Sequence, residues 1–185
     1  MPTLEEVAKQ PPERRLGRMS RTADDLAAAI RGQSQATLMR RPDSKNWAAN
    51  EVICHLRDIE EVHFIRFHMI LTNDDPTIYA DPSAADRFAE DRQYLRNDAS
   101  QALAAFRRRR EESLAVLRTL TPEQWQRGCL HPTRGRLTID TFVTMLAWHD
   151  DNHLDQLRRA LDSLSSASKS ARGYLVTTSL AARLR

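Results

Sequence analysis

The chain has 185 residues, of which 41% are hydrophobic and 29% charged, and this composition fits one globular domain with its own core. Five glycines are too few for an all-β sandwich or barrel, and no apolar run approaches the roughly 18 residues of a membrane-spanning helix. The N-terminal residues lack the apolar stretch of a signal peptide, and two cysteines are too few for a disulfide framework. We therefore expect a cytoplasmic protein without membrane contact.

The net charge of +3 does not indicate nucleic-acid binding, because the C-terminal residues carry it. Residues 163–185 contain four basic side chains and no acidic one, which leaves the other 162 residues at about −1. The run Arg107–Arg110 is followed by two glutamates, so we expect these arginines to pair with acids on an exposed helix face. A phosphate-binding patch is the alternative.

The first predicted helix runs from about Arg21 to Arg31 and could begin as early as Leu16. Thr22 and Asp24 occupy positions that suit N-cap residues. The next segment, residues 41–46, has the composition of a loop.

A second, longer helix is predicted from Ala48 to Leu71, because apolar residues recur there with helical spacing. Residues 74–97 contain two prolines and no such pattern. We interpret them as a long crossover with short helical pieces around Ala84 to Leu95.

The third predicted helix begins at Asp98 or Ser100 and ends at Leu120. Thr121 followed by Pro122 predicts a short helical turn, since a capping residue before proline is typical of helix starts. Residues 128–136 contain two glycines and a proline, and we interpret them as a loop.

The fourth predicted helix runs from Thr138, its expected cap, to Leu161. Four helices joined by one long crossover predict an all-α four-helix bundle over residues 1–162. Residues 163–185 are rich in serine and basic, and we expect them to form a flexible tail.

Three histidines are the candidate functional residues. His149 and His153 are four residues apart, so both imidazoles lie on one face of the fourth helix, among apolar residues. His55 lies on the apolar face of the second helix. Three imidazoles that point into one core can supply three corners of a tetrahedral metal site and leave the fourth open for water or substrate.

Several other interpretations of these residues stay open. Histidines on an apolar face are often core residues that bind no metal. A zinc protease of the HExxH type needs a glutamate where this chain has Asp150. Di-iron bundles use Glu-x-x-His pairs, to which Glu60 with His63 and Asp150 with His153 correspond. The further carboxylates of such a site are not evident.

Two segments carry a resemblance to a known family. Residues 47–60, WAANEVICHLRDIE, resemble the opening motif of the DinB/YfiT-like superfamily of metal-dependent enzymes, and residues 146–157, LAWHDDNHLDQL, resemble its closing motif. The loop from Gly128 to Leu137 is similar to the segment before the last helix in that family. The resemblance covers roughly residues 15–162.

The resemblance implies a four-helix bundle, often a homodimer, and a zinc or nickel ion held by His55, His149 and His153. The family includes enzymes that use low-molecular-weight thiols, such as bacillithiol S-transferases and mycothiol-dependent isomerases. A thiol S-transferase or a hydrolase acting on a small molecule is therefore expected, with the open metal position activating a thiol or water. A thiol would then serve as cosubstrate.

Four further side chains are candidates for holding or flanking the metal ligands: Asp58, Asp150, Asn152 and Gln156. Cys54 precedes His55 and is expected to be a small core residue. Two alternatives to an enzyme remain. The chain could be a metal-binding stress-response protein with little catalysis, or a metal-free helical interaction module.

Overall fold

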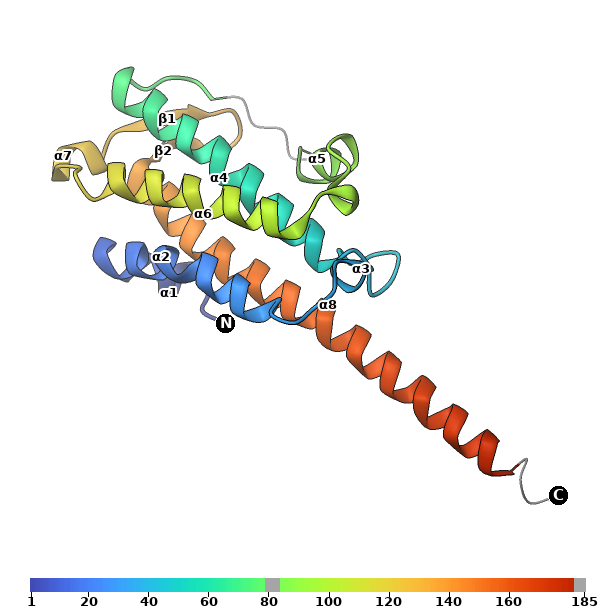
Figure 1. Cartoon of the computed structure of the whole chain (residues 1–185). Coiled ribbons are helices and arrows are strands. Elements are labelled where there is room, and N and C mark those ends of the chain that lie inside the picture. Colours follow the sequence, from blue (N-terminus) through green and yellow to red (C-terminus); the bar gives the residue numbers. More distant parts are fainter. Residues whose placement is uncertain (79–83, 182–185) are drawn as a thin grey trace.

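Four long helices form the body of the molecule in the computed structural model, which describes residues 1–78 and 84–181, and side-chain surroundings for 1–78 and 87–165. They are α2 (Pro12–Ala29), α4 (Ala49–Thr72), α6 (Ala99–Leu117) and α8 (Ile139–Ala181). Both α2 and α4 pack against α6 and α8, so each helix contacts two neighbours in a four-helix bundle (Figure 1). The expected architecture is confirmed.

The N-terminal part of the chain differs from the sequence-based prediction. A short helix, α1 (Leu4–Ala8), comes first, and α2 begins at Pro12 rather than near Leu16 or Arg21. Thr22 and Asp24 therefore lie inside α2 and are not caps. The reason is that proline at the first helical position starts a helix well, because its missing N–H would have no partner there. A further short helix, α3 (Gln35–Leu38), lies before α4.

The crossover between α4 and α6 has the expected short helical pieces, α5 (Ala84–Asp91) and the 3₁₀ helix η1 (Tyr94–Arg96). Residues 79–83 lie outside the described part of the chain. The end of the crossover is attached to α4 because Asn50 Nδ2 donates to the carbonyls of Tyr94 and Asn97, at 2.7 and 2.8 Å. Short helix α7 (Pro122–Trp125), capped by Thr121, is also as predicted.

The segment before α8 is a β-hairpin, so the prediction that it is only a loop is wrong. Strand β1 (Gly128–His131) pairs antiparallel with β2 (Gly135–Thr138), with Cys129 opposite Leu137, and both of these side chains are buried. Main-chain bonds from Leu130 to Pro76 and Ile78 attach β1 to the crossover. These long-range bonds stabilise strands that are too short to show a period-two pattern.

Helix α8 is longer than predicted. Thr138 caps it as expected, since its Oγ1 accepts from the amide of Thr141 at 3.2 Å. The helix does not end at Leu161, however, but continues to Ala181 and extends past the other helices (Figure 1). Residues 162–181 contain no proline, the residue that most strongly ends a helix. The alanine, leucine, lysine and arginine residues among them favour helix, so the helix can continue through this segment. The predicted flexibility of this segment stays a prediction.

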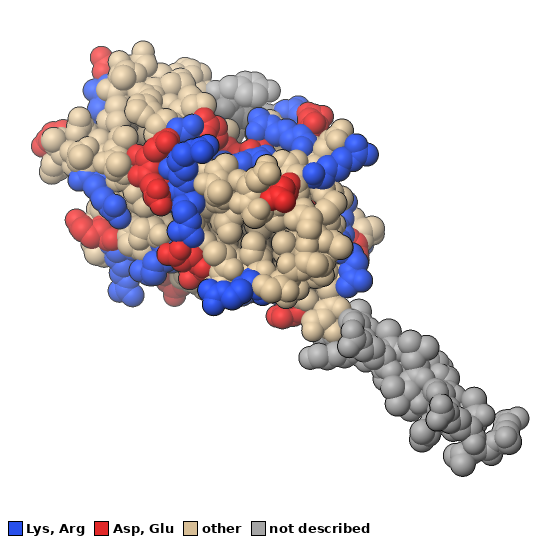
Figure 2. Space-filling model, in the orientation of Figure 1, with Lys and Arg blue, Asp and Glu red and all other residues tan. Residues whose placement is uncertain are grey.

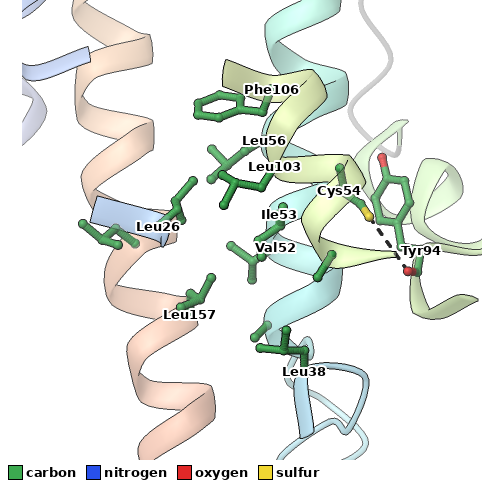
Figure 3. Packing of buried hydrophobic residues seen from close by; sticks show 14 of the residues in the cluster. Leu26, Leu38, Val52, Ile53, Cys54, Leu56, Tyr94, Leu103, Phe106 and Leu157 are labelled. Atoms are coloured by element: carbon green, nitrogen blue, oxygen red, sulfur yellow. Dashed lines mark hydrogen bonds between the residues drawn. The ribbon is translucent and has the colours of Figure 1, made fainter. Parts of the chain in front are cut away.

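The core is filled by side chains from all four long helices. Figure 3 shows Leu26 and Leu157 facing Val52, Ile53, Leu103 and Phe106 across the bundle. Cys54 is buried beside the Tyr94 carbonyl, and burial raises the pKa of its thiol to about 11. Cys54 is thus a core residue, as expected, and not a thiolate nucleophile.

Basic and acidic side chains are interspersed on the face of the molecule shown in Figure 2. Arg107 pairs with Asp24 of α2, and Arg109 pairs with Glu61 of α4 and Glu112 of its own helix, so these arginines pair with acids as expected, but mostly across helices. Within residues 1–78 and 84–181, no helix combines the length and the apolar content that a membrane span requires.

Candidate metal centre

The three predicted histidines meet in the space between α4 and α8. One ring nitrogen from each of His55, His149 and His153 lies within 4.8 Å of the others. The Nε2 atoms of His55 and His149 are 3.1 Å apart. The ring centroids of His153 lie 4.6 Å from His55 and 4.2 Å from His149. Packing of α4 on α8 therefore brings together residues that are about a hundred positions apart in sequence.

The start of α4 is fixed one turn before His55. Glu51 accepts a hydrogen bond from the Ala48 amide at 2.8 Å, which satisfies a helix N-terminal donor. The Glu51 carboxylate is buried and also binds the Arg41 guanidinium through two hydrogen bonds. This arrangement orients the first turns of α4 and with them the His55 side chain.

Among the described residues, one of the three histidines has its Nδ1 hydrogen-bonded. His153 Nδ1 lies 2.7 Å from Oε1 of Gln156, one turn further along α8. The Nδ1 atoms of His55 and His149 are buried without a partner among the described residues. Gln156 thus contacts a site histidine, as the sequence suggested.

Burial keeps all three imidazoles neutral. It lowers the pKa of His55 to about 3, with a further contribution from nearby His153. Burial and the neighbouring histidines hold the pKa of His149 well below 6.5. Burial also lowers the pKa of His153, although the hydrogen bond with Gln156 opposes it. Neutral imidazole is the form that binds metal ions, so no proton has to leave at neutral pH.

Trp47 covers one side of the cluster. Its ring meets His55 edge to face with centroids 5.1 Å apart, and stacks at 6.4 Å on His153. Trp47 and Gln156 also line a pocket of about 270 Å³ between the segment before α4 and the part of α8 that follows the histidines. Asp43, Asn46 and Arg159 add polar groups to its lining. The pocket adjoins the site through side chains that contact the histidines.

Asp58 lies near the cluster, but its hydrogen bonds and ion pairs among the described residues are made with Arg57, Tyr94 and Arg92. Its carboxylate accepts from Arg57 and the Tyr94 hydroxyl, both at 2.7 Å, and pairs with Arg92 at 2.8 Å. Burial works to raise the pKa of Asp58, but the hydrogen bonds from Arg57 and Tyr94 outweigh it and lower that pKa. The carboxylate therefore stays ionised and favours positive charge at His55. No local sequence pattern marks Tyr94 as a partner of Asp58, because the crossover brings the two together.

A buried ionic network connects all four long helices next to the site. Arg110 of α6 donates to Glu60 of α4 at 2.9 Å, to Asp150 of α8 at 2.5 and 3.0 Å, and to the Met19 carbonyl of α2. Thr22 adds a hydrogen bond to Asp150 at 2.6 Å. The expectation that Arg110 lies on an exposed face is therefore wrong. It is 2% exposed because two buried carboxylates face it from α4 and α8.

The hydrogen bonds of Asp150 and Asn152 lead elsewhere than to the three imidazoles. Asp150 follows His149, and its described hydrogen bonds are to Arg110 and Thr22, so it holds helices together. The Asn152 amide donates to the Trp148 carbonyl on its own helix. The di-iron interpretation fails, because the guanidinium of Arg110 lies between the carboxylates of Glu60 and Asp150.

The geometry and the donor set of the cluster fit a divalent metal ion. Two nitrogens that bind one tetrahedral zinc at about 2.0–2.1 Å lie roughly 3.3 Å apart. The distance between the Nε2 atoms of His55 and His149 is close to this value. Among the described residues, no carboxylate or thiol joins the three imidazoles. His63, His68 and His131 lie outside the cluster.

Fold and site together define a four-helix bundle with a three-histidine centre between α4 and α8. The chain belongs to the DinB superfamily, whose family model matches residues 18–157. The resemblance seen in the sequence motifs is thus confirmed over most of the bundle.

Curated relatives come from several bacilli. The chain is 26% identical over 151 residues to YfiT of Bacillus subtilis, covering 81% of this chain and 84% of that protein. A protein of Oceanobacillus iheyensis is 32% identical over 112 residues, or 60% of this chain and 63% of the relative. Both carry the provisional name of a metal-dependent hydrolase. These names and the three-histidine cluster imply a metal ion without identifying it.

Solved structures support the fold. YfiT of Bacillus subtilis, described as having an unusual four-helix bundle topology, superposes with a TM-score of 0.77 at 23% identity. The alignment covers 85% of this chain and 89% of YfiT. A mutant of a mycothiol-dependent maleylpyruvate isomerase superposes with a TM-score of 0.65 at 13% identity, over 85% of this chain and 63% of the isomerase.

Proposed function

We propose that this chain is a metal-dependent hydrolase of small molecules whose divalent metal ion is held by His55, His149 and His153. One observation carries the proposal. Among the described residues, three imidazoles converge and no fourth ligating side chain joins them. Three protein ligands leave a coordination position open, which is the pattern of catalytic rather than structural metal sites.

Three imidazoles suit zinc and nickel better than calcium or magnesium, which prefer oxygen ligands. When bound, such an ion would lower the pKa of water at the open position toward neutrality and polarise a substrate carbonyl.

The chain's own residues prepare the centre for a cation. Burial keeps the imidazoles unprotonated, and the ionised Asp58 favours positive charge close to His55. Trp47 packs on two of the rings and limits solvent access from its side. The adjoining pocket of about 270 Å³ supplies space for a small polar group beside the centre.

Thiol-dependent transfer or isomerisation is the second candidate. It is supported by the fold shared with a mycothiol-dependent isomerase. The same open position could bind a low-molecular-weight thiol and lower its pKa, which would generate a thiolate at neutral pH. Cys54 does not supply this thiolate, because it is buried and its own pKa is raised.

The test begins with the metal content of tag-free protein, measured by mass spectrometry. We expect about one zinc or nickel ion per chain in the native protein, and loss of the ion in His149→Ala and His153→Ala variants. A His68→Ala variant is the matched control, because His68 is an exposed histidine of α4 outside the cluster. Metal-free native protein that gains no thermal stability with added Zn²⁺ or Ni²⁺ would contradict the proposal.

Activity assays then distinguish the hydrolase from the thiol-dependent transferase or isomerase. Metal-loaded protein is assayed with ester and amide substrates in the absence of thiols, and with electrophilic acceptors in the presence of a small thiol. Metal-dependent turnover without thiol supports the hydrolase. Turnover only with thiol supports the transferase or isomerase.

A homodimer is the remaining proposal about partners, and it rests on the family resemblance alone. Light scattering after size-exclusion chromatography would test it. A mass near 42 kDa, twice the 21.2 kDa of the chain, is the expected result.

A further inference from the structure

The three histidines of the centre differ in how the protein holds them. Gln156 is half-buried on α8, and its side-chain oxygen lies 2.7 Å from Nδ1 of His153. Corresponding partners for His55 and His149 are absent among the described residues, since the Nδ1 atoms of both are buried and unpaired. Among the described residues, His153 is thus the one site histidine whose Nδ1 is held by a side chain.

The contact with Gln156 selects one tautomer of His153. A neutral imidazole carries one N–H, and the amide oxygen of Gln156 can only accept a hydrogen bond. The proton therefore resides on Nδ1, and the lone pair on Nε2 is free to bind a cation. The hydrogen bond also restricts rotation of the ring.

The other two rings have no such acceptor among the described residues, and one of the two is in the other tautomer. The Nε2 atoms of His55 and His149 are 3.1 Å apart, so without metal one of them donates its proton to the other. For both to bind a metal through Nε2, the donor ring must move its proton to Nδ1. That atom is buried without an acceptor, and an unpaired buried donor carries a cost of about 1–3 kcal/mol.

We propose that Gln156 is a positioning residue that holds the His153 ring in the Nδ1–H tautomer, with its Nε2 lone pair free, before the ion binds. This role deepens the proposed function and rests on it for its biological meaning. The hydrogen bond itself exists without metal, so it can be measured separately.

The first measurement is the tautomer of His153 in metal-free protein, read from long-range ¹H–¹⁵N correlation spectra at neutral pH. The His153 signals are assigned by their loss in a His153→Ala variant. We expect the Nδ1–H tautomer to dominate in the native protein. In Gln156→Leu, which keeps the volume and removes the acceptor, the Nε2–H tautomer should become populated. Gln156→Glu restores an acceptor and should restore the native tautomer.

The second measurement is the affinity for Zn²⁺, obtained by competition with a chromophoric chelator. Loss of a group that orients a metal ligand lowers affinity by about 10–100-fold, and we expect this loss in Gln156→Leu but not in Gln156→Glu. Asn152→Leu is the matched control, because Asn152 is also half-buried on α8 but its hydrogen bond among the described residues is to the Trp148 carbonyl. Its Zn²⁺ affinity should equal that of the native protein.

The outcomes separate this role from the proposed function. An unchanged His153 tautomer in Gln156→Leu, or an equal loss of affinity in Asn152→Leu, would overturn the role of Gln156. A native protein that binds no Zn²⁺ or Ni²⁺ would overturn the proposed function, while the spectra would still decide the role of Gln156. If circular dichroism shows that Gln156→Leu is unfolded, Gln156→Met replaces it.

Discussion

Arg110 of α6 and Asp150 of α8 form a buried ion pair with two hydrogen bonds. Asp150 directly follows His149 in the sequence. The same guanidinium binds Glu60 on α4, which also carries His55. Arg110 therefore fixes the two helices of the candidate metal centre relative to each other. Arg110 thus links the helices that carry His55 and His149 through its bonds to Glu60 and Asp150.

Replacing Arg110 by methionine should destabilise the fold strongly. The change leaves two buried carboxylates without their counter-charge, and breaking a buried ion pair in this way costs about 3–5 kcal/mol. Urea unfolding measures the free energy of unfolding. Arg107→Met is the control, since Arg107 pairs at the surface with the exposed Asp24, and such pairs contribute about 0–1 kcal/mol. Similar losses in the two variants would show that the network is not structurally important.

The stability of the metal-free protein should fall as the pH is lowered, and His63 should contribute to the fall. His63 is 8% exposed, and burial, aided by Arg66, lowers its pKa to about 4. The unfolded chain, with a histidine pKa near 6.5, binds a proton that the folded chain excludes between about pH 4 and 6.5. His63 therefore contributes stability that is complete above pH 6.5 and is lost as the pH falls toward 4.

The measurement is the free energy of unfolding between pH 4 and 7 for the native protein and His63→Gln. A single buried histidine changes the free energy of unfolding by at most about 1.4 kcal/mol per pH unit. His63→Gln should lack this contribution, so its free energy of unfolding should depend less steeply on pH. His68→Gln changes an exposed histidine one turn or so further along α4 and serves as control. Parallel curves for native protein and His63→Gln would contradict this prediction.

Two glycines should respond to alanine in opposite directions. At Gly128 in β1 an added Cβ would lie 2.6 Å from the Leu137 carbonyl oxygen of the paired strand, so Gly128→Ala must distort the hairpin. At Gly17 inside α2 the nearest atom would be 3.9 Å away, and alanine in a helix interior is more stable than glycine by about 0.5–1 kcal/mol. Thermal unfolding should show a lower Tm for Gly128→Ala and a higher Tm for Gly17→Ala. A higher Tm for Gly128→Ala would show that the Leu137 carbonyl does not approach Gly128 this closely.

Trp47 should report metal binding through its fluorescence. Its ring centroid lies 5.1 Å from that of His55, so a paramagnetic ion held by the histidines would quench its emission. We expect Ni²⁺ to quench the native protein, and Trp47→Phe to lose most of this quenching. Trp125→Phe should keep it, because Trp125 lies on α7, at the end of the bundle where α6 leads into the hairpin. Equal quenching in both variants would place the ion elsewhere.

Local sequence patterns were sufficient to predict the four long helices, apart from the start of α2 and the end of α8, and the three histidines of the cluster. The spacing of His149 and His153 places both rings on one helical face whatever surrounds the helix, because 3.6 residues make one turn. The apolar stripe around His55 similarly places this residue toward the core. α4 and α6 were predicted to within three residues at each end for the same reason.

Other features depend on partners that are distant in sequence, and only the tertiary structure decided them. Arg110 resembles its exposed neighbours in the arginine run, and it is buried because Glu60 and Asp150, 50 and 40 positions away, meet it in the core. The hairpin forms because β1 also bonds to the crossover. Burial and ion pairing of this kind depend on which helices become neighbours. The sequence by itself therefore determined that four long helices form and which faces carry the three histidines, and the packing of the bundle decided that these histidines meet.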